Sequence, residues 1–181
     1  TPLMTIRLTP ETTPEIIKEA RQAGAMAAKL YPEGVTTGAE KGITNIEKLT
    51  KVFQAIEQSG MILSIHAEKP GSSMLAAEED FIPVLEKIIS LAPDLKMVVE
   101  HVSTQIMLEW VKKAPPNIAG AITPHHLSLN TDAVFGRTHN FCKPVAKSEF
   151  DRQALIQTVI SGNPKFFLGT DSAPHPRKNK E

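Results

Sequence analysis

The sequence has one cysteine, few aromatic residues and no excess of charge of either sign. A single cysteine, Cys142, excludes an internal disulfide and every cysteine-rich zinc module. Lysine plus arginine equals aspartate plus glutamate at 20 each, so no net field draws the surface toward nucleic acid or an acidic membrane. We therefore expect a small-molecule partner, and neither nucleic acid nor membrane.

Long apolar stretches and nucleotide-binding turns are missing as well. No apolar run approaches the roughly 20 residues that span a bilayer, and no basic segment followed by an apolar one opens the chain. Together with the lack of paired cysteines, these absences predict a cytoplasmic location. No GxGxxG or GxxxxGK(S/T) turn is present, so the chain lacks the fingerprint of nucleotide-binding α/β sheets.

The sequence does contain short apolar runs that alternate with amphipathic stretches. Six runs are typical of buried strands, at residues 3–8, 25–31, 61–67, 96–102, 118–122 and 165–168. Helical spacing occurs at 14–23, 46–56, 78–91, 104–113 and 149–161, and the stretch after Thr123 and Pro124 is predicted to be a long irregular loop. This alternation predicts an α/β fold with a parallel sheet, either doubly wound or closed into a barrel. The 181 residues fit one domain, 1–181, and fall short of the about 250 of a complete barrel.

Four of the six strand-like runs end in a residue that can bind a metal ion. These residues are Lys29, His66, His101 and Asp171. The C-terminal ends of parallel strands share one face of the sheet, and β/α barrels carry their active sites on that face. The pattern therefore predicts that the four side chains converge around a cation.

Each of these residues also has a purely structural interpretation. Either histidine could be a hydrogen-bonded core residue, and Asp171 could be the N-cap of a helix. A strand-end lysine usually extends its amine into water. If Lys29 is buried instead, its pKa falls, and a neutral amine can add carbon dioxide to become a carbamate, an anionic oxygen ligand able to bridge two metals.

Five short segments occur in an order and spacing that match one family. They are KLYP at 29–32 with TT at 36–37, SIHAE at 64–68, EHVST at 100–104, TPHHL at 123–127 and GTDSAPH at 169–175. Together they resemble dihydroorotase, in the shorter bacterial and plant-type form found in the amidohydrolase superfamily, and the last heptapeptide is the most specific. The resemblance implies an α/β fold of the (β/α)8 TIM-type barrel kind, with about six of its eight βα units represented here.

The resemblance implies two zinc ions in a complete site. Lys29 would be carboxylated and bridge them, while His66 and His101 would hold the more exposed ion. Asp171 would bind the other ion and act as the catalytic residue, carrying a proton between the attacking water and the ring nitrogen. The implied substrate-binding residues are His175, Thr36, Thr37 and Lys143, the last of which stands where the family is expected to have an apolar residue.

The implied activity is the reversible cyclisation of N-carbamoyl-L-aspartate to L-dihydroorotate in de novo pyrimidine biosynthesis, by a homodimer when the protein is full length. The family's first strand carries a His-x-His pair, and this chain contains none. We therefore expect the first two strands and the closing C-terminal region to be absent from it. Two alternatives stay open: a dihydropyrimidinase or hydantoinase with the same ligands, and a non-catalytic, metal-free barrel relative.

Three further histidines and the single cysteine are not predicted to bind a metal. His126 matches a family histidine near the site, and His125 is a local variation. Cys142 is interpreted as structural and His139 as a surface residue.

Overall fold

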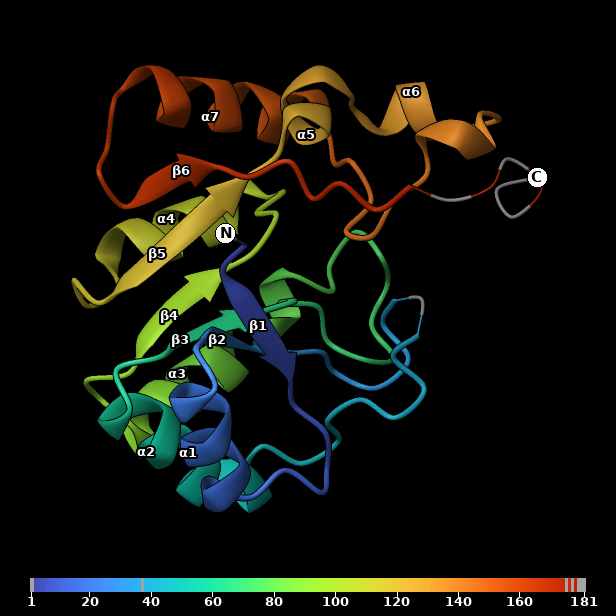
Figure 1. Cartoon of the computed structure of the whole chain (residues 1–181). Coiled ribbons are helices and arrows are strands. Elements are labelled where there is room, and N and C mark those ends of the chain that lie inside the picture. The colour runs from blue at the N-terminus through green and yellow to red at the C-terminus, as the bar shows by residue number, and fades with distance from the viewer. Residues whose placement is uncertain (1, 37, 175, 177, 179–181) are drawn as a thin grey trace.

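A computed structural model describes residues 2–36, 38–174, 176 and 178 (Figure 1). Its strands form one sheet in the order β1-β2-β3-β4-β5-β6, and every neighbouring pair is parallel. The strands are β1 (Met4–Arg7), β2 (Ala25–Leu30), β3 (Ile62–Ile65), β4 (Lys96–Val99), β5 (Ile118–Ile122) and β6 (Phe166–Leu168). A spatial order equal to the chain order is that of a barrel wall, because a doubly wound sheet reverses its order at a switch point. The structure thus decides between the two predicted architectures.

Five helices connect successive strands, as the helical spacing predicts. They are α1 (Pro14–Gln22), α2 (Thr50–Gln58), α3 (Ile82–Leu91), α4 (Gln105–Lys113) and α7 (Glu149–Ile160). Single 3-10 turns, η1 (Glu47–Leu49) and η2 (Glu79–Phe81), precede α2 and α3, so α3 begins later than the predicted 78. Among the described residues that follow β6, no α-helix is present.

The prediction of a long irregular loop after Pro124 is wrong. That stretch contains α5 (Pro124–Ser128), α6 (Thr131–Val134) and the 3-10 turn η3 (Thr138–Asn140). The side chain of Thr123 accepts a hydrogen bond from the His126 backbone, and Asn130 accepts one from Ala133. These N-caps satisfy free amide groups at the start of helices too short to show a periodic pattern.

The helices pack against one face of the curved sheet and leave the other face to the cavities described below (Figure 1). Strand side chains that point toward the helices are apolar and fully buried, as Leu30, Leu63, Ile65 and Val99 show. Side chains on the opposite face alternate with them and include Lys29, which pairs in register with Ser64 of β3. The sheet therefore carries its core on the outside of the arc and polar groups on the inside. No helix in the described part of the chain is long and apolar enough to cross a membrane.

Candidate active site

Two cavities lie on the inner face of the sheet, at the C-terminal ends of the strands. One has a volume of about 600 Å³ and includes side chains from β1, β2 and the segments after β4 and β6. The second, of about 870 Å³, extends toward α6 and the chain that follows it. Both are lined by Lys29, Tyr31, His101 and Asp171, so three of the predicted ligands border both spaces. His66 lines the larger cavity.

The two predicted histidine ligands lie side by side. His66 directly follows β3 and His101 comes two residues after β4, and they are 1% and 5% exposed. Their ring centroids are 4.5 Å apart, with the rings inclined at 65°. His101 has a backbone φ of 43°, in the left-handed region that costs a non-glycine residue energy. Strained backbone at a strand end that aims a side chain into a cavity is typical of functional sites.

The nitrogen atoms of these rings are used differently. Nε2 of His66 lies 2.7 Å from a carboxylate oxygen of the buried Glu68, which fixes the ring and leaves Nδ1 to face another group. Nδ1 of His101 is buried and has no hydrogen-bond partner among the described residues. Burial, followed by the charges of His66 and Lys29, holds the pKa of His101 well below its ordinary value. His101 is therefore a neutral imidazole, the form that binds metals.

Lys29 lies partly buried on β2, between cations and carboxylates. Burial lowers the pKa of its amine, and the neighbouring charges of Glu100 and Asp171 act in the opposite direction without cancelling that effect. The amine nitrogen lies 5.1 Å from the centre of the Tyr31 ring, and Arg7 approaches the same ring at 5.7 Å.

Asp171 borders both cavities from the segment that follows β6. It follows β6 by three residues, is exposed, and has a backbone φ of 46°. Residues 172–174 are not helical, so Asp171 is not the N-cap of a helix. His66, His101 and Asp171 do not form a group whose ligand atoms all lie within 4.8 Å. The structure brings the two histidines together, and Lys29 and Asp171 line the same cavities.

The predicted substrate-binding residues are only partly described. Thr36 and Lys143 line the larger cavity together with His66 and His101. Thr37 and His175 lie outside the described residues. His139 is exposed, as predicted, and borders the larger cavity.

Sequence reasoning assigned no role to two buried glutamates that support the site. Glu68 was visible two residues after His66, and a carboxylate so close to a candidate ligand is a signal for a hydrogen-bonded support. Glu78 accepts hydrogen bonds from the backbone nitrogen of Ser103, at 2.9 Å, and from its hydroxyl, at 3.0 Å. These bonds hold the backbone just after His101. Burial raises the pKa of Glu78 to about 7, against the effects of its hydrogen bonds and of Lys147.

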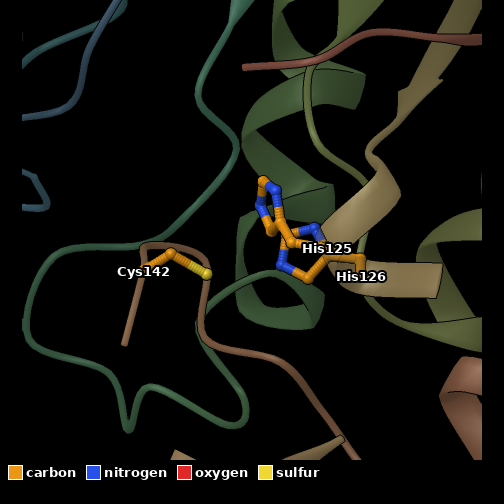
Figure 2. Close-up of side chains that lie close together, drawn as sticks. All are labelled: His125, His126 and Cys142. Carbon is orange, nitrogen blue, oxygen red and sulfur yellow. The ribbon is translucent and has the colours of Figure 1, made fainter. Parts of the chain in front are cut away.

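A second group of potential ligands lies beyond the strand-end set. In the described part of the chain, the group of histidine, cysteine or acidic residues close enough to share an ion consists of His125, His126 and Cys142 (Figure 2). One ligand atom from each lies within 4.8 Å of the other two. His126 is buried: Nδ1 lies 2.8 Å from the Thr123 hydroxyl, and Nε2 lies 2.9 Å from the carbonyl oxygen of Pro144. Burial is the main cause that lowers the pKa of His126 to about 4.

The fold and the strand-end site point to one class: the chain is a partial TIM barrel, and its structural neighbours are amidohydrolases. An L-hydantoinase (dihydropyrimidinase) from Arthrobacter aurescens matches it with a TM-score of 0.82 at 22% identity, over 98% of this chain and 44% of that one. At that identity the likeness shows the fold alone.

Within that class the chain is homologous to dihydroorotase over nearly its whole length, which confirms the resemblance found in the sequence. A probable dihydroorotase of Schizosaccharomyces pombe is 46% identical over 181 residues, covering 98% of this chain and 54% of that protein. The crystal structure of Saccharomyces cerevisiae dihydroorotase in complex with 5-fluoroorotic acid matches with a TM-score of 0.92 at 36% identity, over 98% of this chain and 54% of that one. The chain thus spans about half the length of these relatives. No protein-family model matches it.

Proposed function

We propose that this chain carries the metal-binding half of a dihydroorotase, an enzyme that reversibly cyclises N-carbamoyl-L-aspartate to L-dihydroorotate in pyrimidine biosynthesis. The observation that carries the proposal is the position of Lys29, whose amine has a lowered pKa and lines the cavities that the two histidines border. Higher identity to dihydroorotases than to the hydantoinase supports this substrate over the hydantoinase alternative.

The residues present fit a zinc centre. The buried, unpaired Nδ1 of His101 lies in a ring next to His66, and the Nε2 of His66 already bonds to Glu68. Imidazole nitrogens and carboxylate-type oxygens are the ligands that zinc accepts. In a complete site, Lys29, His66, His101 and Asp171 would contribute ligands to two ions, and carboxylated Lys29 would be shared between them. Zinc bound there supplies a Lewis acid that activates water at neutral pH and polarises a carbonyl group.

The side chains would then act as follows. The neutral amine of Lys29 adds to carbon dioxide, forming a nitrogen–carbon bond and losing a proton, which converts a cationic side chain into an anionic oxygen ligand. Asp171 accepts a proton from the water that attacks the ring amide carbon. It returns that proton to the ring nitrogen as the carbon–nitrogen bond breaks, and cyclisation follows the reverse path.

Substrate binding is assigned to the wall formed by α6 and the chain after it. The substrate is anionic, and Lys143 brings a positive charge to the larger cavity, where Thr36 offers a hydroxyl donor. Thr37 and His175 complete this proposed set from positions outside the described residues.

Replacement of Lys29 tests the proposal. We expect Lys29→Ala and Lys29→Arg to abolish interconversion of carbamoyl aspartate and dihydroorotate, because neither can form a carbamate. In the unmodified protein supplied with 13C-bicarbonate, NMR should show a carbamate carbon that both variants lack. Full activity in either variant would refute the role of Lys29. Turnover of hydantoin or dihydrouracil in place of dihydroorotate would favour the hydantoinase alternative, and a folded full-length protein without turnover would favour the non-catalytic one.

A cytoplasmic location and a homodimeric assembly complete the proposal. Both follow from the resemblance and the composition rather than from any contact in the structure. Cell fractionation and analytical ultracentrifugation, respectively, would test them.

A further inference from the structure

The group His125, His126 and Cys142 is separate from the proposed zinc ligands in both sequence and position. His125 and His126 lie in α5, whereas Cys142 lies in the segment between η3 and α7 (Figure 2). None of the strand-end residues Lys29, His66, His101 or Asp171 belongs to the group. It borders the larger cavity through His125 and Cys142, on the wall that also carries Lys143.

Two of the three side chains point at one atom. Nε2 of His126 lies 2.9 Å from the carbonyl oxygen of Pro144, and Sγ of Cys142 lies 3.2 Å from the same oxygen. Each donates a hydrogen bond to that oxygen, since a carbonyl can only accept one. The nitrogen and the sulfur are therefore held close together by a shared acceptor. Figure 2 shows the sulfur of Cys142 turned toward the two histidine rings.

We propose that His125, His126 and Cys142 form a second metal site, for a thiophilic divalent cation of the zinc type, in the wall of the larger cavity. One thiolate and two imidazoles make a donor set that such cations prefer to magnesium or calcium. Three protein ligands leave a fourth tetrahedral position open toward the cavity.

Binding requires a defined movement of protons. The thiol of Cys142 loses its proton to solvent, and the sulfur–metal bond replaces the S–H bond. The ring proton of His126 moves from Nε2 to Nδ1. There the Thr123 oxygen, 2.8 Å away, can accept a hydrogen bond from it. Nε2 then binds the metal, and the Pro144 carbonyl gives up its two donors. The net release is one proton per metal ion at a pH below the thiol's ordinary pKa of about 8.5.

The single cysteine makes this site measurable in the presence of the other one. Cys142 is the one sulfhydryl in the chain, so any sulfur-to-metal charge-transfer absorption reports on this site alone. We expect titration of the purified protein with Co²⁺ or Cd²⁺ to produce that absorption with a stoichiometry of one ion. Cys142→Ser should remove it. Absence of the absorption in the unmodified protein would overturn the proposal.

A bare thiol also binds these cations, so the histidines need their own test. We expect His125→Gln to weaken Cd²⁺ binding at Cys142 by at least about tenfold, because the loss even of supporting groups costs metal sites roughly 10–100-fold. His139→Gln is the matched control, since His139 borders the same cavity but is not part of the group. Equal Cd²⁺ affinity in the His125→Gln variant and the unmodified protein would show that Cys142 binds the ion without His125, and the proposed site would be wrong.

His126 is buried and its ring is hydrogen-bonded to Thr123 and to Pro144, so its replacement would disturb the packing of α5. X-ray absorption spectroscopy of the unmodified protein, loaded with one equivalent of Cd²⁺, tests its role without a substitution. We expect one sulfur and two imidazole nitrogens around the ion. A spectrum with sulfur and no more than one imidazole would show that the two histidines do not both bind the ion, which would overturn the proposed site. Neither outcome depends on the proposed enzymatic activity.

Discussion

The cavity wall after β3 and β4 differs from the wall that follows β6. His66 and His101 are almost fully buried, and carboxylates support both turns: Glu68 bonds to the ring of His66, and Glu78 bonds to the backbone just after His101. Asp171 is exposed, and the residues on either side of it, 169–174, form neither helix nor strand. Preorganised groups suit the holding of a metal, whereas a less enclosed carboxylate suits the transfer of protons to and from substrate. Under the proposed function, the wall after β3 and β4 would bind the metal, and the segment after β6 would exchange protons with the substrate.

Removal of the exposed carboxylate should have the largest effect on turnover. We expect Asp171→Asn to lower kcat by about 10²- to 10⁴-fold, the usual contribution of a positioned general acid–base group. The ion held by the buried histidines should stay, so metal analysis should still find zinc in the variant. Asp94→Asn, at an exposed position between α3 and β4, is the matched control and should keep its activity. Normal turnover in the Asp171→Asn variant would show that Asp171 does not transfer the proton, and the proposed difference between the two walls would be wrong.

Weakening the buried wall should act on metal affinity. We expect Glu68→Gln to lower zinc affinity by roughly 10- to 100-fold, because the amide no longer makes the 2.7 Å charge-assisted bond to the ring of His66. Competition with a chelator measures the affinity, and excess zinc should restore most of the activity. Glu79→Gln, at an exposed position, controls for the loss of one negative charge. Unchanged zinc affinity in Glu68→Gln would show that the carboxylate does not support the ligand.

The strand-end residues could be predicted from the sequence because the rule that places them is topological. Apolar runs mark the strands, and parallel strands bring their C-terminal ends to one face, which puts Lys29 and His101 on the same cavities. The support from Glu78 was not predictable, because its bonds to Ser103 join residues 25 positions apart and no periodic pattern records them. The same holds for Cys142, which meets α5 only after the chain has passed through two further short elements.

The short helices escaped prediction for a different reason. α5 and α6 have five and four residues, too few for an apolar stripe to repeat. Their formation depends on the caps at Thr123 and Asn130, and such residues are equally common in loops. Local sequence was therefore ambiguous where tertiary contacts decide the structure.

The smallest expected effect is on the pH dependence of the free energy of unfolding, and it comes from Glu78, which supports the wall after β4. Glu78 has a pKa of about 7 in the fold and an ordinary value of 4.5, so between these values the folded state keeps a proton that the unfolded state has released. The contribution of Glu78 to the free energy of unfolding therefore falls as pH rises through this window and levels off above it. Glu78→Gln should remove that slope and cost about 1 kcal/mol at pH 5, where one hydrogen bond to Ser103 is altered. Urea unfolding from pH 5 to 8 measures both quantities, and the exposed Glu79→Gln variant should keep the slope. If Glu78→Gln kept it as well, a group other than Glu78 would be responsible for the pH dependence of this wall.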